Sequence, residues 1–523
     1  MNAPQISVIV RFRDEAQYLE AVLRALRAQD FPSEPEILAI DNHSQDGSDD
    51  IAKRFADRVF SIDDYRPGRA LNEAVERARA PFIAVLSGHA IPCNSQWLTN
   101  LYSHLHLAKL AGVYGGQLYN INSRFLDKRD LDIFSSFIPR IEVENSDFWN
   151  ANSMFPRHVW EQQQFDETVY ELEDHYWTKQ LLPQGYRVHF EPRSLVYHYS
   201  HIARLDREFL PPCSDTTEKM ISSAIAELRH TNEWPRVMAA GLTLSSLTKH
   251  PSIITAVPAL VRHLLSHWDF DVRWRMAQAL GKIPSADSAH GLALALSDSS
   301  FYVRDEAAWS LARLGSLGAQ AVFACERQLS CEFRQFAALA LGLSRCPKAE
   351  ARGIEILAEG LASKNPTERL NAAYFCGELA GVPGACALIR GLDAMLEADP
   401  DSSHVACWAR GCFSAFDSAD RVWDKIPEIA EAHPNALARF EAVVAIGKRA
   451  MATCDSSLVD LVSERCQDRD DRVRYGAVQS LRLLCEAGAE ITPPLELEDD
   501  RDYGVRFELN LLRKHSRACS LNN

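Results

Sequence analysis

The strongest constraint on this sequence is a repeat that fills its second half. An arginine precedes two small or apolar residues, three and four positions later, at Arg236, Arg273, Arg304, Arg334 and Arg369, and similar segments open at Arg439, Arg474 and Arg506. The spacings lie between 30 and 37 residues, apart from one interval of 70. This period is typical of stacked helix pairs, in which no pair buries its apolar face alone. An all-helical solenoid is therefore predicted.

The repeated arginines are expected to tie one helix pair to the next, rather than to bind a ligand. Each lies where the second helix of a pair should begin, often a few residues after an aspartate or asparagine, as Arg369 follows Asn365. Residues 298–315 and 468–478 resemble a HEAT repeat or a HEAT-like lyase repeat. A lyase would leave the first half of the chain unexplained, so we treat it as a minor alternative.

The first half follows a different pattern, in which short strands alternate with helices. Four strands are predicted, over residues 6–10, 37–40, 59–62 and 81–86. This alternation favours a largely parallel sheet, which binds ligands at the carboxyl ends of its strands. The predicted ligand edge comprises residues 11–14, 41–48 and 87–89.

The pattern changes at two adjacent prolines, Pro211 and Pro212, in a polar stretch suited to a linker. We therefore expect an α/β domain over residues 1–210, followed by a helical repeat domain over residues 215–516. The 523 residues carry a formal charge of −15, which disfavours binding to nucleic acid or to anionic lipid. Membrane association is not evident, because the apolar runs are short and no signal-peptide core follows Met1. A cytoplasmic location is expected.

An ordered series of motifs gives the first half its chemistry. Neither the phosphate-binding glycine loop nor the dinucleotide fingerprint is present. The series runs through Asp41-Asn42, Asp46-Gly47-Ser48, Arg69 to Asn72, Ser87-Gly88-His89, Glu173-Asp174, Trp177 and His198. It resembles the inverting family 2 glycosyltransferases of the GT-A fold over roughly residues 5–205. The fold class expected is an α/β GT-A nucleotide-sugar-binding domain followed by an all-α HEAT-like solenoid.

The resemblance implies that a nucleotide-sugar donor binds along the ligand edge. In the family, the aspartate matching Asp41 contacts the nucleoside, and Asn42, Asp46, Arg69 and Asn72 fall in donor-side motifs. Each of these residues has a structural alternative. Asp46 followed by a glycine and a serine also reads as a turn entering a helix, where a carboxylate caps the main chain.

Ser87-Gly88-His89 departs from the family, which usually has Asp-x-Asp for a divalent metal on the diphosphate. His89 keeps the third position, and His198 lies where some relatives place a further ligand. Three interpretations stay open: His89 and His198 bind Mn²⁺ or Mg²⁺ weakly, His89 contacts the diphosphate without a metal, or the site is inactive. Imidazole suits Mn²⁺ moderately, whereas hard cations prefer carboxylates.

The resemblance places the general base at Asp174. Transfer with inversion needs one base beside the acceptor nucleophile, although acids at a helix start also favour the helix dipole. Glu173, Trp177 and Asn152 are expected on the acceptor side, with core packing as the alternative for Trp177.

Two functional hypotheses follow. In the first, the chain is an inverting glycosyltransferase whose repeat domain holds a polysaccharide, protein, peptide or small-molecule acceptor, another partner, or a second copy of the chain. In the second, it is a non-catalytic repeat scaffold that binds a nucleotide sugar. The missing Asp-x-Asp favours the second, and the ordered motifs favour the first.

Overall fold

The computed structural model describes residues 4–121, 138–144, 146–199, 217–398, 400–416, 423 and 425–522, apart from a few side chains. The chain forms two compact units, one of Met1–Ile202 with Gly488–Asn523 and one of Ala203–Ala487. The expected helical range, 215–516, overlaps the second unit but does not coincide with it, because the last residues of the chain join the first unit. The linker expected at 210–215 lies outside the described residues.

The first unit contains a mixed sheet with the strand order β3-β2-β1-β4-β8-β6-β9-β5, and β7 pairs with β9. Four parallel strands confirm the sequence prediction: β1 (Ile6–Phe12), β2 (Glu36–Asp41), β3 (Arg58–Ser61) and β4 (Phe82–Ser87). The others are β5 (Ala90–Pro92), β6 (Leu110–Leu118), β7 (Arg140–Glu142), β8 (Asn152–Pro156) and β9 (Arg187–His198). Because β8 lies antiparallel between β4 and β6, the sheet is less parallel than predicted.

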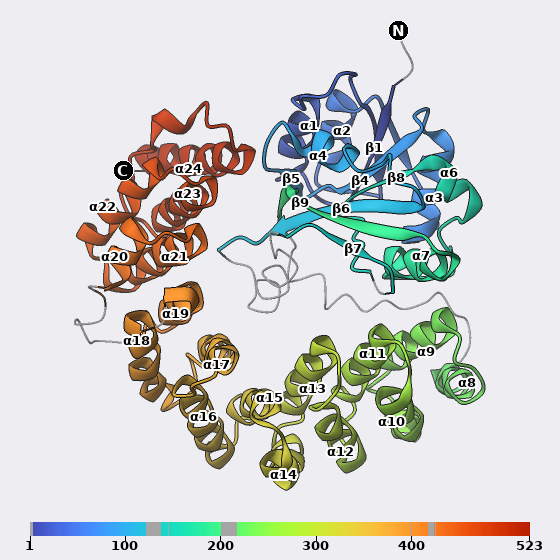
Figure 1. Ribbon diagram of the computed structural model, residues 1–523, viewed down its shortest axis with the longest axis vertical. Helices are drawn as coiled ribbons and strands as arrows, with labels where there is room; N and C mark the ends of the chain where they lie inside the picture. The colour runs from blue at the N-terminus through green and yellow to red at the C-terminus, as the bar shows by residue number, and fades with distance from the viewer. Residues whose placement is uncertain are drawn as a thin grey trace. The chain divides into compact units, whose positions relative to one another are not determined.

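Helices cover both sides of this sheet. They are α1 (Leu19–Arg27), α2 (Ser48–Phe55), α3 (Pro67–Arg77), α4 (Trp97–Tyr102), α6 (Arg157–Gln162) and α7 (Glu173–Leu181). Figure 1 shows α1, α2 and α4 on one side of the sheet and α7 on the other. Apolar side chains of β1, β2 and β4 are buried beneath α3 and α7, in a core that includes Phe155 and Trp177. The sheet is therefore buried on both faces, as its apolar strands require.

The C-terminal helix α24 (Tyr503–Asn522) belongs to this α/β unit. The main-chain N–H of Tyr503 donates to the Cys93 carbonyl at 2.7 Å, and the Tyr197 hydroxyl donates to Asp502 Oδ2 at 3.2 Å. A Cβ atom at Gly504 would lie 2.3 Å from the Tyr197 ring. The helix therefore fits closely against β9 because glycine stands at the contact.

The second unit is an array of helix pairs, visible in Figure 1 from α8 to α23. Its α-helices are α8 (Thr217–His230), α9 (Trp234–Ser246), α10 (Val257–Ser266), α11 (Phe270–Leu280), α12 (Ala286–Ala295), α13 (Phe301–Arg313), α14 (Ser316–Cys325), α15 (Cys331–Gly342), α16 (Pro347–Leu361), α17 (Pro366–Glu378), α18 (Ile389–Ala398), α19 (Ser403–Cys412), α20 (Lys425–Ala432), α21 (Ala436–Thr453), α22 (Ser456–Glu464) and α23 (Asp471–Glu486). Odd-numbered helices from α9 to α23 contact one another in succession. Among the described residues, no helix is both long and apolar enough to cross a membrane.

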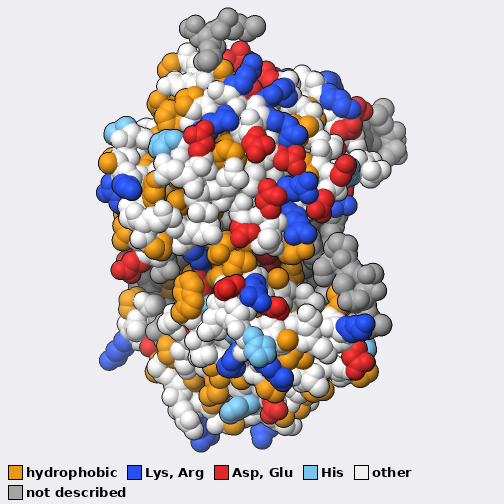
Figure 2. Space-filling view, turned by 90° about the vertical axis from the view of Figure 1, so that its right-hand side faces the viewer, with side chains coloured by type: hydrophobic (Ala, Val, Ile, Leu, Met, Phe, Trp, Pro, Cys, Tyr) orange, Lys and Arg blue, Asp and Glu red, His pale blue; other side chains and the backbone are white. Residues whose placement is uncertain are grey.

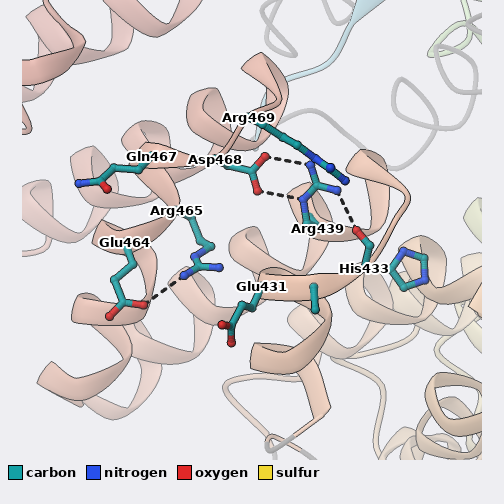
Figure 3. Close-up of a pocket in the computed structure, with 9 residues that line it drawn as sticks. Glu431, His433, Arg439, Glu464, Arg465, Gln467, Asp468 and Arg469 are labelled. Carbon is teal, nitrogen blue, oxygen red and sulfur yellow. Dashed lines mark hydrogen bonds and ion pairs between the residues drawn. The ribbon is translucent and has the colours of Figure 1, made fainter.

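The repeated arginines have the structural role predicted for them. Arg439 forms two hydrogen bonds with the carboxylate of Asp468, both at 2.9 Å, and donates to the His433 carbonyl at 2.7 Å. Figure 3 shows these contacts at the pocket that Arg439 lines with Glu431 and other residues of α20 to α23. Arg273, Arg304 and Arg369 make equivalent hydrogen bonds. Each donates to the main-chain carbonyls of the residues five and six positions before it.

We predict that Arg439→Met destabilises the helical unit by about 3 kcal/mol, because it leaves the Asp468 carboxylate partly buried without its partner. Arg236→Met is the matched control, since Arg236 opens the first repeat but its side chain is 52% exposed and paired with Glu227. The control should change stability far less than Arg439→Met does, because solvent screens an exposed ion pair. Calorimetric unfolding of the full chain measures both. Equal effects of the two substitutions would contradict this role for the buried arginine.

Candidate functional site

The carboxyl end of β1 is where the predicted ligand-edge segments meet. Phe12 is in register with Asp41 on β2, and Arg11 is in register with Ser87 on β4. The Gly88 N–H donates to the Arg11 carbonyl at 2.8 Å. A Cβ atom at Gly88 would lie 2.6 Å from the Phe12 Cβ atom, so only glycine allows this approach. The three segments share one edge, as expected.

Asp41 ends β2 as a buried carboxylate. Its Oδ1 atom accepts hydrogen bonds from the Ser44 N–H at 3.0 Å and the Ser44 hydroxyl at 2.6 Å. These bonds shape the following loop, so the Asx-turn role weighed for Asp41 is present. Among the described residues Oδ2 has no hydrogen-bond partner, which leaves one carboxylate oxygen for a ligand. Asn42 lies beside it, with its main-chain N–H bonded to the Phe12 carbonyl at 3.0 Å.

Asp46 caps the main chain, which is the structural alternative to donor binding. Oδ1 accepts from the Ser48 N–H at 3.0 Å and from the Ser48 hydroxyl, and Oδ2 accepts from the Ala16 N–H at 2.8 Å. Its slight burial would raise the pKa of Asp46, but the hydrogen bonds from Ser48 and Ala16 outweigh it and lower that pKa. Both oxygens serve the loops after β1 and β2, so Asp46 is a structural residue in this arrangement.

Arg69 and Asn72 both lie on α3 but in different surroundings. Arg69 is 40% exposed and pairs with Asp64 at 3.1 Å and Glu73 at 3.3 Å. Asn72 is buried, and four hydrogen bonds occupy its amide. It donates to the Phe165 carbonyl and the Glu167 carboxylate, and it accepts from the Trp160 indole and the Phe165 N–H. Its amide is thus occupied inside the core, and the donor contact expected of Asn72 stays a prediction.

His89 and His198 lie together, with a carboxylate behind them. Their Nε2 atoms are 3.1 Å apart, and Glu15 Oε1 lies 2.8 Å from His89 Nδ1. Glu15 is 1% exposed. The sequence motifs do not point to this residue, because nothing in the sequence relates it to His89. Burial, and secondly the neighbouring His89, lower the pKa of His198 to about 3. His198 is therefore neutral at pH 7.

The C-terminal helix reaches this histidine pair through Tyr199. The Tyr199 N–H donates to the His89 carbonyl at 3.0 Å, and its hydroxyl donates to Glu508 Oε1 at 3.0 Å. The ring stacks on Tyr18 with centroids 4.9 Å apart. Because Glu508 is 309 residues from Tyr199 in the chain, sequence reasoning had no signal for this support.

Glu173 and Asp174 begin α7, beside β1. Arg11 Nη1 lies 2.7 Å from Glu173 Oε1. Burial, and secondly the charge of Glu173, raise the pKa of Asp174 from 3.8 to about 6. The Asn150 N–H donates to Asp174 Oδ2 at 2.7 Å, while the buried Asn150 Nδ2 has no partner among the described residues. Asp174 is therefore a buried carboxylate of raised basicity. Asn150, which bonds to it, has a side-chain N–H donor that no other described residue uses.

Two expected acceptor-side residues lie in the core. Trp177 has no exposed surface, packs against Phe155 and donates its indole N–H to the Gln163 carbonyl at 2.6 Å. Asn152 is also fully buried, where it accepts from the Trp97 indole at 2.8 Å and donates to two main-chain carbonyls. The polar atoms of both side chains are thus bonded inside the domain, and the acceptor-side role expected of each stays a prediction.

Comparison with known proteins agrees with this geometry. Residues 7–165 match the family model for glycosyl transferase family 2, and residues 221–312 and 257–327 match HEAT repeats. The expected layout is confirmed: an α/β domain that matches the glycosyl transferase family 2 model precedes an all-helical region that matches HEAT repeats.

Individual relatives are distant. Glycosyltransferase AglE of Haloferax volcanii is 26% identical over 196 residues, which are 36% of this chain and 64% of the relative. The chain thus spans slightly under two thirds of that protein. A mannosyltransferase from Pyrobaculum calidifontis, solved with GDP-mannose and Mn²⁺, has a TM-score of 0.35 at 16% identity, covering 68% of this chain and 88% of its own. Mannosyl-3-phosphoglycerate synthase from Rubrobacter xylanophilus has a TM-score of 0.30 at 14% identity, covering 39% and 70%. These scores are too low to support an argument about activity.

The two α3 residues give a test of their different roles. Asn72→Ala should destabilise the α/β unit by about 2–4 kcal/mol, because it orphans the Trp160 and Phe165 N–H groups in the core. Arg69→Ala removes only exposed ion pairs and should cost less than about 1 kcal/mol. Thermal unfolding of both variants measures the difference. A larger loss for Arg69→Ala would contradict the core role of Asn72.

Proposed function

We propose that the α/β unit transfers a sugar, with inversion, from a nucleotide-sugar donor to an acceptor. The observation that carries the proposal is that three segments adjoin the end of β1. Asp41 is in register with Phe12, Gly88 before His89 bonds to the Arg11 carbonyl, and Glu173 before Asp174 pairs with the Arg11 side chain. The family 2 match supports sugar transfer by this domain. A single displacement needs a place for the leaving diphosphate and a base for the incoming hydroxyl, and this edge offers groups for both.

The donor would lie along the carboxyl ends of β1, β2 and β4. Asp41 Oδ2 is available to accept hydrogen bonds from a nucleobase or ribose. Arg69 is an exposed cation on α3, and it would have to leave Asp64 to contact a donor. Asn42 borders the same loop. Asp46 and Asn72 would act indirectly, through the loop and the helix that they hold.

The histidine pair fits a divalent cation. Two ligands about 2.1 Å from an ion, at right angles, lie roughly 3 Å apart, which agrees with the 3.1 Å between the Nε2 atoms. Glu15 lies at His89 Nδ1 and thereby favours the tautomer that presents the Nε2 lone pair. His198, held neutral by burial, can offer an Nε2 lone pair in one of its two tautomers. When bound, Mn²⁺ would neutralise the charge that develops on the departing diphosphate.

Asp174 is the proposed general base. It would take the proton from the acceptor hydroxyl as that oxygen attacks the sugar carbon and the bond to the diphosphate breaks. Its pKa of about 6 makes it a stronger base than an ordinary aspartate while leaving it mostly ionised at neutral pH. Glu173 is held by Arg11 and would orient the base from the adjoining position on α7. The N–H of Asn150 fixes the Asp174 carboxylate.

The helical unit would hold the acceptor or a partner. Stacked helix pairs offer an extended surface suited to a glycan, a protein or a peptide. Figure 2 shows one face of the molecule, with side chains of both units, and on it acidic and basic side chains are interspersed among hydrophobic ones. Mixed charge of this kind supports short-range recognition more than long-range attraction. Self-association of the chain stays a prediction.

A non-catalytic nucleotide-sugar scaffold is the second candidate. It is favoured by one observation, the replacement of Asp-x-Asp by Ser87-Gly88-His89. The presence of His198 and Glu15 around His89 favours the enzyme instead. Turnover of a panel of uridine, guanosine and thymidine diphosphate sugars by the full chain separates the two, since a scaffold binds a donor without consuming it.

Asp174→Asn should lower turnover by about 10²–10⁴-fold with donor affinity preserved, because the amide has no basicity for the hydroxyl proton. In the parent protein, kcat should fall about tenfold per pH unit below pH 6, as Asp174 becomes protonated. Asp63→Asn, on a fully exposed aspartate, is the control. Unchanged turnover in Asp174→Asn, measured with a donor that the parent consumes, would exclude this residue as the base.

Removal of divalent metal should abolish turnover, and Mn²⁺ should restore it. His89→Ala and His198→Ala should each raise the Mn²⁺ concentration needed for half-maximal rate by about tenfold or more, since each removes a proposed ligand. His106→Ala, on an exposed histidine of the same domain, should behave as the parent protein. Turnover that resists chelation would instead favour direct contact between His89 and the diphosphate.

A further inference from the structure

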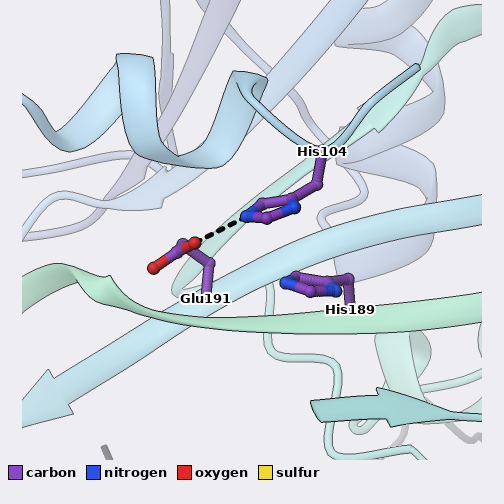
Figure 4. A group of neighbouring side chains, drawn as sticks. All are labelled: His104, His189 and Glu191. Carbon is purple, nitrogen blue, oxygen red and sulfur yellow. Dashed lines mark hydrogen bonds and ion pairs between the residues drawn. The ribbon is translucent and has the colours of Figure 1, made fainter. Parts of the chain in front are cut away.

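A second group of metal-binding side chains lies away from the site described above. His104 follows α4, and His189 and Glu191 lie two residues apart on β9. One ligand atom from each of the three residues lies within 4.8 Å of the others. Figure 4 shows the two imidazole rings stacked, with the Glu191 carboxylate beside His104. His198 is nine residues further along β9, on the order of 30 Å in an extended strand, so this group is separate from the His89–His198 pair.

The contacts within the group leave one side chain unused. His104 Nε2 lies 2.6 Å from Glu191 Oε2, and the His104 and His189 rings stack with centroids 3.8 Å apart. His189 is 7% exposed, yet neither of its ring nitrogens has a hydrogen-bond partner in the described structure. A buried polar group without a partner is costly. A ligand bound to a ring nitrogen of His189 would remove this free-energy cost.

We propose that His104, His189 and Glu191 form a binding site for a zinc-class divalent cation. Two imidazoles and one carboxylate are a ligand set that Zn²⁺ accepts, with water in the fourth position. The ion takes the place of the His104 Nε2 proton, which passes to solvent, and thereby bridges His104 to Glu191 Oε2. His189 supplies the third ligand atom.

The surroundings allow this exchange. Glu191 is fully buried, and Arg193 holds both of its oxygens through Nε and Nη2 at 2.8 Å, so the carboxylate is fixed in place. His189 must turn out of the stacked position to face the ion. Rotation about χ2 of histidine is soft, and no hydrogen bond of His189 is lost. The His104 side chain is 22% exposed, which gives the ion an entry path from solvent.

The bound ion would join two segments that are distant in the sequence. His104 lies in the connection between α4 and β6, and this connection already meets β9 where the Arg187 N–H donates to the Lys109 carbonyl at 2.8 Å. A cation would add a coordinate bond between the same segments. Its role is therefore structural, since it stabilises the packing of α4 and β6 against β9.

The test uses the full chain carrying His89→Ala and His198→Ala, which removes the other proposed metal site. After metal is stripped with a chelator, Zn²⁺ is titrated by calorimetry and Co²⁺ by the visible absorption typical of four-coordinate cobalt. We expect one equivalent of Zn²⁺ to bind. Adding His189→Leu should weaken binding by about tenfold or more. Adding His106→Leu, on an exposed histidine two residues from His104, should leave binding unchanged.

Absence of Zn²⁺ binding in the double variant would overturn the proposal, and so would unchanged affinity in His189→Leu. If His189→Leu fails to fold, His104→Ala takes its place, because this side chain reaches the surface. The same loss of affinity supports the site, and its absence overturns it. Neither result depends on nucleotide-sugar turnover, so failure here is distinct from failure of the proposed transferase activity.

Discussion

The ligand edge depends on the hydrogen bond and the ion pair that Arg11 makes at the end of β1. The main-chain carbonyl of Arg11 accepts a hydrogen bond from Gly88, the residue before His89. The guanidinium of Arg11 pairs with Glu173, the residue before Asp174. Burial alone would lower the pKa of Arg11, but the charges of Glu173, Tyr65 and Asp174, with the hydrogen bond to Glu173, together outweigh it and raise that pKa. Arg11 therefore holds the segment of His89 by its main chain and the segment of Asp174 by its side chain. Because arginine stays protonated in proteins, Arg11 keeps its charge throughout the working pH range.

Much of this architecture could be predicted because it follows from periodicity. Apolar strands alternating with helices indicated the parallel part of the sheet, and the edge at Asp41 and His89 followed from the strand ends. The arginine period indicated the helical array in the same way. Roles that depend on tertiary surroundings could not be read from the same pattern. Asn72 and Trp177 lie at family motif positions, yet their polar atoms are occupied inside the core.

Partners that are distant in the sequence set a second limit on prediction. Glu15 meets His89 only because the loops after β1 and β4 share an edge, and Glu508 meets Tyr199 across 309 residues. The helical unit is thus inserted between β9 and α24 of one compact unit. Both ends of the array are covalently joined to the α/β unit.

The two histidines of the proposed metal site would determine which divalent metal it prefers. Carboxylates favour hard cations such as Mg²⁺, which demands oxygen ligands and gives up water reluctantly. Two imidazoles shift the preference toward Mn²⁺ and later transition metals, for which nitrogen is a better ligand. Burial reinforces the shift, since a pKa of about 3 keeps His198 neutral and able to bind metal well into acid. In the proposed reaction, protonation of Asp174, with its pKa of about 6, therefore begins at a higher pH than protonation of His198.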